Sequence, residues 1–174
     1  MTLSNPPTSS GRTGRIPPAL DDSPEFARLV MISRRLTAAG VGHALGGTGL
    51  LYSMGFAVKP RDWDLLTDAP LGDLRSALAD LNLEVPAPNP DYPSDYLVQI
   101  RTGTCLIEII GRFAIRTADG IVRIPSRVAG MLHGVPLGDP ADWLRAYRAM
   151  ARVDPDGHPI DGEKIRMLES LRDE

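Results

Sequence analysis

The sequence of 174 residues has a single cysteine, no long apolar run and no excess of positive charge, and each absence excludes a class of protein. The lone Cys105 cannot form a disulfide within the chain. No apolar stretch approaches the roughly 20 residues that span a membrane, and residues 1–15 lack the apolar core of a secretory signal. We therefore expect a cytoplasmic protein with no membrane partner. The net charge of −3 at pH 7 provides no overall basic field for nucleic acid.

Two common nucleotide-binding motifs are also missing. No Gly-Lys-Ser or Gly-Lys-Thr occurs anywhere in the chain, which excludes a P-loop. The Gly-Thr-Gly run at 47–49 begins a Rossmann fingerprint, but Tyr52 stands where the third glycine is required, and no repeated βαβ pattern follows. The Asp-x-Asp motif at 62–64 also occurs in metal-dependent glycosyltransferases, whose domains are usually longer than this chain.

Composition suggests a tail followed by one domain. Residues 1–20 are rich in proline, serine, threonine and glycine, which bury too little surface to offset the entropy lost on ordering, so we expect a disordered or loosely packed tail. The sequence as a whole is 43% hydrophobic and 24% charged, as in an ordinary globular protein. Residues 21–174 suffice for one core and leave little room for a second, so we expect a single domain there.

Hydrophobic periodicity and turn residues divide the chain into helices and strands. Ser23 and Pro24 are typical of a helix start, and Gly40 of a helix stop. An Asp-Gly pair at 119–120 predicts a hairpin turn, and the proline-rich segment 86–95 predicts a surface loop. The expected helices are 24–39, 48–54, 71–81, 140–152 and 161–172, and the expected strands are 41–45, 62–67, 96–102, 104–110, 113–117 and 121–124.

Two carboxylates share one face of the strand expected at 62–67. Because side chains alternate along a strand, Asp62 and Asp64 point to one side and Trp63 points to the other. Their Cα atoms would lie roughly 6.6 Å apart, which is two strand rises. Carboxylates on one face repel each other unless a cation lies between them, and Mg²⁺ prefers such oxygen ligands together with substrate phosphates. The pair therefore indicates a magnesium site.

A third acid and a glycine turn complete the expected site. Glu108 lies among apolar residues in the second strand of the first expected hairpin, where a charge is costly unless it faces solvent or a metal. If this strand lies beside the Asp-Trp-Asp strand, Glu108 completes a carboxylate triad. Gly46 and Gly47 allow the backbone to approach a phosphate closely, and Thr48 opens a helix whose N–H groups favour an anion.

This constellation resembles the nucleotidyltransferase superfamily of the DNA polymerase β type. The resemblance rests on Leu45-Gly46-Gly47-Thr48, a short helix, Asp62-x-Asp64 between apolar residues, and an acid on a later strand. It is closest to the small bacterial branch that includes AbiEii-like toxins and the aminoglycoside and lincosamide nucleotidyltransferases, and it covers residues 41–110 best. It implies an α+β fold in which a mixed β-sheet is flanked by helices and followed by C-terminal helices.

The resemblance also implies an activity and residue roles. The protein would transfer a nucleoside monophosphate from a nucleoside triphosphate (NTP) to a hydroxyl acceptor, with Mg²⁺ as cofactor. The turn 46–48 would hold the triphosphate, while Asp62 and Asp64 would bind metal. Glu108 would bind metal or accept the proton of the attacking hydroxyl. Many members have serine in place of Thr48 and aspartate in place of Glu108, and both changes keep the functional group.

The acceptor is left open between RNA, protein and a small molecule, and so is the base of the NTP. A toxin neutralised by an antitoxin protein is one version of this function. The alternative is a non-catalytic module of the same fold that binds nucleotide or a partner protein. An RNA acceptor would draw on the arginines of the two expected hairpins, which are Arg101, Arg112, Arg116 and Arg123.

Several other side chains have two interpretations. Lys59 and Arg61, just before the acids, either contact phosphate or lie in solvent. Tyr92 and Tyr96 flank the proline-rich loop and either stack on a base or acceptor, or pack locally. Trp143 belongs to an apolar stripe at helical spacing, which favours a role in the core.

Overall fold

The computed structural model describes residues 23–150 and 161–171. The predicted tail at 1–20 and the ends of the last two predicted helices, at 151–152 and 172, lie outside these residues. The described helices are α1 Pro24–Ala38, α2 Gly47–Ser53, α3 Leu71–Ala77, α4 Pro140–Met150 and α5 Gly162–Ser170. The described strands are β1 Ala44–Leu45, β2 Trp63–Thr67, β3 Tyr96–Thr102, β4 Cys105–Gly111, β5 Ala114–Thr117, β6 Gly120–Arg123, β7 Val128–Leu132 and β8 Val135–Gly138. None of these helices is both long enough and apolar enough to cross a membrane.

Six strands form one mixed sheet in the order β3-β4-β2-β1-β8-β7. The β2–β4 and β1–β8 pairs are parallel, and the other neighbours are antiparallel. Strands β5 and β6 form a separate hairpin. The mixed sheet with its helices confirms the predicted α+β class, and the pairing of β2 with β4 confirms that the strand of Glu108 lies beside the strand of Asp64.

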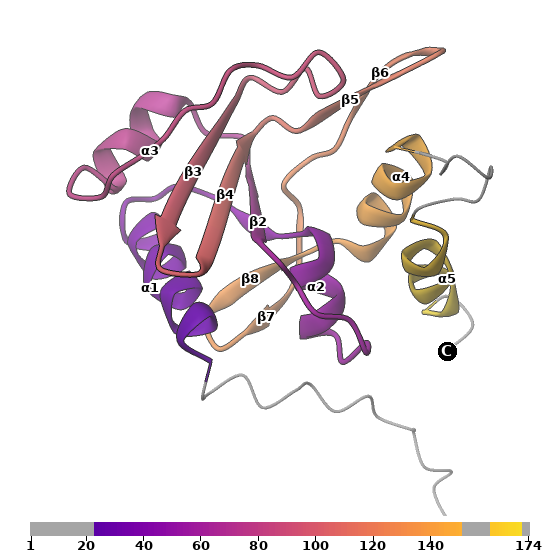
Figure 1. Cartoon of the computed structure of the whole chain (residues 1–174), viewed down its shortest axis with the longest axis horizontal. Helices are drawn as coiled ribbons and strands as arrows, with labels where there is room; N and C mark the ends of the chain where they lie inside the picture. The colour runs from indigo at the N-terminus through magenta and orange to yellow at the C-terminus, as the bar shows by residue number, and fades with distance from the viewer. Residues whose placement is uncertain (1–22, 151–160, 172–174) are drawn as a thin grey trace, which may run out of the picture.

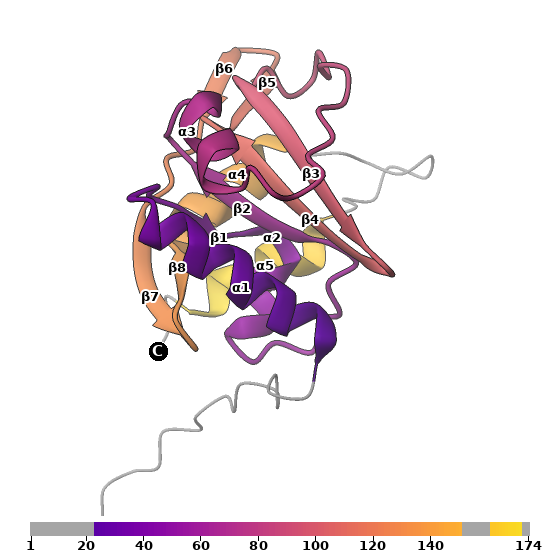
Figure 2. The same cartoon turned by 90° about the vertical axis from the view of Figure 1, so that its left-hand side faces the viewer.

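Helices cover both faces of the sheet (Figure 1). Helices α1 and α3 lie on one face, and α2, α4 and α5 lie on the other, as the turned view in Figure 2 also shows. Two hydrophobic clusters follow this division. Leu65 of β2 and Ile109 of β4 pack in the cluster with α1 and α3. Leu66 and Ile110 belong to the cluster of α2, α4 and α5. Because side chains alternate along a strand, Asp64 and Glu108 face the α4 side with Leu66 and Ile110.

The predicted first helix and the first two hairpins are confirmed. Ser23 caps α1, since its Oγ accepts a hydrogen bond from the Phe26 amide at 3.2 Å. Gly40 follows the helix with φ of 72°, a conformation that glycine adopts without strain. Strands β3 and β4 turn at Gly103, which also has a positive φ of 62°.

Two predicted elements are longer than the described ones, and one hairpin was not predicted. The strand expected at 41–45 is hydrogen-bonded only at Ala44–Leu45. The helix expected at 71–81 ends at Ala77, and the apolar side chains of Leu78 and Leu81 pack against the core from the turn that follows. The β7–β8 hairpin was not expected, since β7 is largely exposed and so lacks the alternating apolar pattern of a half-buried strand.

Candidate active site

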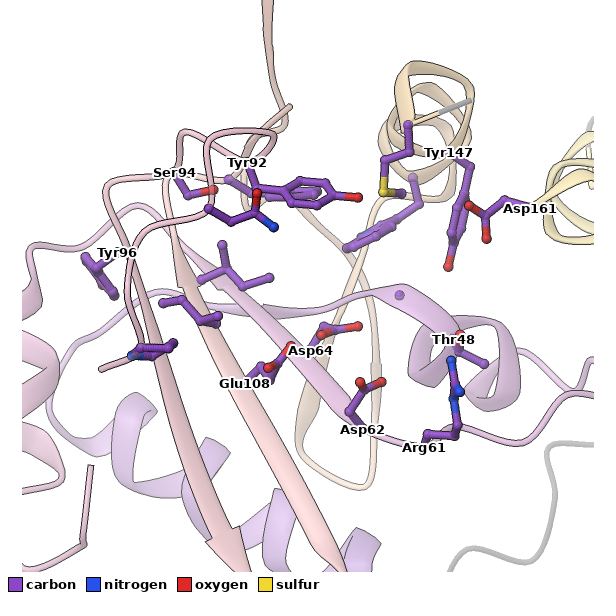
Figure 3. A pocket seen from close by; sticks show the side chains of 18 of the residues that line it. Thr48, Arg61, Asp62, Asp64, Tyr92, Ser94, Tyr96, Glu108, Tyr147 and Asp161 are labelled. Atoms are coloured by element: carbon purple, nitrogen blue, oxygen red, sulfur yellow. The ribbon is translucent and has the colours of Figure 1, made fainter. Parts of the chain in front are cut away.

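The parallel pairing of β2 with β4 sets Asp64 directly opposite Glu108. Asp62 lies just before β2, two residues from Asp64, and lines the same cavity. The three carboxylates line one cavity with a volume of about 920 Å³. Figure 3 shows them side by side along the floor of this cavity. The structure therefore brings together the three acids that the sequence singles out.

Burial and like charge act together on Asp64. Burial raises the pKa of its carboxyl to about 7, and the nearby carboxylates of Asp62 and Glu108 add to the rise. Lys164 acts on the same pKa in the opposite direction. Glu108 accepts a 2.6 Å hydrogen bond from Nε2 of Gln99 on the neighbouring strand β3. A cation placed among the acids would relieve the repulsion that holds the pKa of Asp64 high.

The donor set fits Mg²⁺ in its chemistry, because all three side chains offer carboxylate oxygens and their charges repel one another. Among the described residues, no three His, Cys, Asp or Glu side chains are gathered closely enough to hold a metal ion as they stand. The acids would have to converge further to bind a metal together.

The glycine turn is pressed against the acids. The Gly46 amide donates to the Asp64 carbonyl at 2.8 Å, which ties the turn to β2. Gly47 has φ of 56°, and a Cβ there would lie 2.1 Å from Oδ2 of Asp64, so only glycine fits. A Cβ on Gly46 would lie 1.9 Å from the ring of Trp143. Gly47 and Thr48 line the cavity, and Gly46 lies behind them against the indole.

Helices α4 and α5 supply side chains that sequence reasoning missed. Tyr147 of α4 is buried, its hydroxyl shares a hydrogen bond with the Thr48 side chain, and burial raises its pKa. Lys164 of α5 donates to Oδ1 of the buried Asp161 at 3.0 Å, and its Nζ lies 5.1 Å from the centre of the Tyr147 ring. All of them line the cavity. The scarcity of lysine, found only at 59 and 164, was the one signal that could have drawn attention to Lys164.

The structure gives a location to the side chains for which the sequence left two interpretations. Lys59 and Arg61 line the cavity, so both can reach a ligand there. Tyr96 packs locally, since its hydroxyl donates to the Ala69 carbonyl at 2.8 Å and its ring covers Gly111, and it also lines the cavity. Trp143 is 4% exposed and belongs to the core, as predicted, although one part of it also lines the cavity.

The predicted arginine patch is engaged with the loops around it. Arg112 and Arg123 both approach the carboxylate of Asp95, at 3.7 and 3.9 Å. Arg116 donates to the Pro90 carbonyl at 2.9 Å, and Arg101 lies 3.6 Å from Glu84. Each of these arginines has a nearby acid or carbonyl partner, and the side chains of Arg101, Arg112 and Arg123 remain more than half exposed.

Comparison with solved structures identifies the fold. The chain is similar to a provisionally assigned nucleotidyltransferase from Thermotoga maritima, with a TM-score of 0.58 and 20% identity over 86% of this chain and 92% of that one. It is also similar to ANT(2″)-Ia in complex with adenylyl-2″-tobramycin, with a TM-score of 0.57 and 16% identity over 86% of this chain and 90% of that one. No family model and no curated protein matches the sequence. The chain therefore has the nucleotidyltransferase fold that the sequence predicts.

Proposed function

We propose that the protein is a Mg²⁺-dependent nucleotidyltransferase that moves a nucleoside monophosphate from an NTP to a hydroxyl acceptor. The observation that carries this proposal is the pairing of Asp64 with Glu108 on adjacent parallel strands, with Asp62 just before β2 in the same cavity. The carboxylates line a cavity together with the Gly47–Thr48 turn, within a nucleotidyltransferase fold.

Each part of the cavity has a proposed role. Gly47 and Thr48 hold the triphosphate through the backbone and the hydroxyl, with Gly46 supporting the turn from behind. Arg61 and Lys164, which also line the cavity, add positive charge for the phosphates. Asp62, Asp64 and Glu108 hold Mg²⁺, which when bound stabilises the attacking and leaving oxygens.

The proposed chemistry is an in-line displacement at the α-phosphorus. The acceptor hydroxyl gives its proton to a carboxylate, for which Glu108 is the candidate, while its oxygen bonds to the α-phosphorus. The bond from the α-phosphorus to the oxygen that bridges to the β-phosphate breaks, and pyrophosphate leaves. The residues of this chain contribute position and charge rather than a covalent intermediate.

The cavity favours a small acceptor over a large one. Its volume of about 920 Å³ is bordered by the loop 86–95, β2, β4, α4 and α5, and is near the upper end of sites for small molecules and cofactors. ANT(2″)-Ia binds an adenylylated aminoglycoside within the same fold. These observations support a small-molecule hydroxyl as acceptor, with RNA and protein hydroxyls as the competing classes.

Transfer of label from NTP tests the proposal. The protein is incubated with Mg²⁺, each α-labelled NTP and extracts of small molecules, RNA or protein, and the labelled product is followed. Asp62→Asn and Asp64→Asn should each abolish transfer. Asp119→Asn, which neutralises an exposed acid in the β5–β6 turn, should leave transfer unchanged. Transfer that persists in both site variants would contradict the proposal.

A second function is favoured by one observation at the site. Glu108 is already bonded to Gln99, and within the described residues no three acids gather at metal-binding distance. The engagement of Glu108 by Gln99 is compatible with a non-catalytic module that binds nucleotide without transfer. Calorimetry separates the two, because such a module would bind NTP with Mg²⁺ and never release pyrophosphate.

A toxin function would be a special case of transfer. Its acceptor would be a cellular component needed for growth, and an antitoxin protein would neutralise it. Induced expression in a bacterial host should then arrest growth, and Asp64→Asn should relieve the arrest. Growth that continues with the unaltered chain, expressed in soluble form, would count against it.

A further inference from the structure

One wall of the cavity is built of aromatic rings, and the roles given so far to phosphate and metal do not use it. The ring centres of Tyr92 and Phe113 lie 6.2 Å apart with an angle of 23° between the planes. Phe113 and Trp143 lie 5.9 Å apart at 24°. The three rings are therefore nearly parallel and offset, and all three line the cavity.

We propose that this row, the Tyr92–Phe113–Trp143 platform, is where the base of the NTP stacks. The inference rests on the proposed function and names the part of the site that holds the nucleoside. It concerns the wall of the cavity that the proline-rich loop and α4 form.

The platform begins at the phosphate turn. Trp143 packs so closely on Gly46 that no side chain larger than hydrogen fits between them. From there the row passes through Phe113 to Tyr92 in the proline-rich loop. A base joined to its phosphates by a ribose can thus reach the rings while the triphosphate stays on the Gly47–Thr48 turn.

Tyr92 is the accessible end of the row. Phe113 and Trp143 are 6% and 4% exposed, whereas Tyr92 is half-buried. Figure 3 shows Tyr92 and Tyr147 on two sides of the cavity above Asp64. A planar group entering between the loop and α4 would meet the Tyr92 ring first.

The loop that carries Tyr92 is held in one position. The Arg116 amide donates to the Asp91 carbonyl at 2.8 Å, and the Ala114 amide donates to Oγ of Ser94 at 3.0 Å. These bonds on either side of Tyr92 tie the loop to β5, and nearby prolines restrict its backbone further. A ring fixed before the ligand arrives loses little entropy on binding, which is the property that a stacking platform needs.

The surroundings of the platform suit a base rather than phosphate. The loop lines the cavity with apolar groups, namely Val85, Pro86, Ala87, Pro88 and Pro93. Asp95 of the same loop also lines the cavity, and its carboxylate lies 3.7 Å from Arg112 and 3.9 Å from Arg123. Stacking does not read the base edge, because every base has a π-face, so we expect all four NTPs to bind, with the larger purines bound more tightly.

Binding of nucleotide compared with binding of its phosphates alone tests the platform. Calorimetry on the full chain with Mg²⁺ would use a non-hydrolysable ATP analogue with a methylene group between the α- and β-phosphates, and inorganic tripolyphosphate. Tyr92→Leu should weaken binding of the analogue about fivefold to a hundredfold, since base stacking on an aromatic ring contributes on the order of 1–3 kcal/mol. Its affinity for tripolyphosphate should change less than about twofold, because the phosphates do not reach the ring.

A conservative variant, and a comparison of the affinities lost for the two ligands, show whether the Tyr92 ring holds the base. Tyr92→Phe keeps the ring and should keep the affinity for the analogue. Equal loss of affinity for analogue and tripolyphosphate would show that Tyr92 supports the site only as a structural residue, and would overturn the platform. Unchanged affinity for the analogue would overturn it too. If the unaltered protein binds neither ligand, the proposed function itself fails, and the platform fails with it.

Discussion

At the scale of single residues, the burial of the Asp64 carboxyl beside two other acids makes the stability of the fold depend on pH. The pKa of this carboxyl is raised from 3.8 to about 7. The folded protein therefore binds an extra proton between about pH 4 and pH 7. Stability falls as pH rises through this window, because the unfolded chain can ionise Asp64 in water and the folded chain cannot do so without cost.

Replacing this acid should stabilise the protein when metal is removed. Asp64→Asn has no proton to lose, so its free energy of unfolding at pH 8 in EDTA should exceed that of the unaltered protein by on the order of 2 kcal/mol. The difference should vanish near pH 4. Urea denaturation across this pH range measures it.

The Asp64→Asn variant also tests whether Mg²⁺ stabilises the protein through this carboxylate. Added Mg²⁺ should stabilise the unaltered protein at pH 8 and have little effect on Asp64→Asn. Asp119→Asn removes an exposed acid and should change neither the pH dependence nor the response to Mg²⁺. A stability difference independent of pH would contradict the raised pKa.

At the scale of elements, α4 is fastened to the segment before β7 by one buried carboxylate. Asp142 is 3% exposed and accepts two hydrogen bonds of 2.7 Å from Arg127, in a bidentate pair. Arg127 comes directly before β7, so the pair joins the start of that strand to the helix that carries Trp143 and Tyr147. This attachment helps to place two residues of the cavity wall.

Breaking that pair should cost stability. Asp142→Ala removes a charge-assisted bidentate interaction and leaves a small void, so we expect a loss of about 2 kcal/mol in the free energy of unfolding, measured in urea. Glu169→Ala removes one partner of the more exposed Arg148–Glu169 pair and should cost no more than about 1 kcal/mol. Equal losses in the two variants would contradict a special role for Asp142.

At the scale of the whole molecule, the cavity is closed by parts of the chain that are far apart in sequence. The first half of the chain supplies the Gly47–Thr48 turn, Asp62 and Asp64, and the middle of the chain supplies Glu108. Lys164 comes from α5. Lys164 is held by Asp161 and by the Tyr147 ring, and its charge acts on Asp64. The C-terminal helix is thus a wall of the site rather than an appendage.

Removing the charge of Lys164 should weaken nucleotide binding. Lys164→Met keeps most of the side-chain length and should raise the dissociation constant for Mg²⁺–NTP about tenfold, because one charge-assisted contact to phosphate is lost. Arg166→Met, on the exposed side of the same helix, should have no such effect. Calorimetry gives both constants, and thermal melting shows whether each variant is folded. An equal rise of the dissociation constant in the two variants would mean that the net charge of the protein, and not a contact from Lys164, sets the affinity.

Much of the site followed from local sequence pattern, and the reasons are visible in particular residues. The two-residue period of a strand predicted that Asp62 and Asp64 share one face, and the glycine pair predicted a close approach of the backbone beside them. Exposed β7 escaped prediction, because a strand without a buried face carries no alternating pattern. The sequence did not predict Tyr147 and Lys164 as site residues, because the residues around them are typical of ordinary helices.

The sequence by itself determined the α+β class and identified the glycine turn and the first two acids, since these depend on near neighbours in the chain. Only the tertiary structure decided that Glu108 lies opposite Asp64, that Trp143 backs the turn, and that the loop of Tyr92 faces α4. Those arrangements depend on how distant segments pair and pack around two cores. Local periodicity carries no information about the register between distant strands, and so it could name the three acids without showing that they meet.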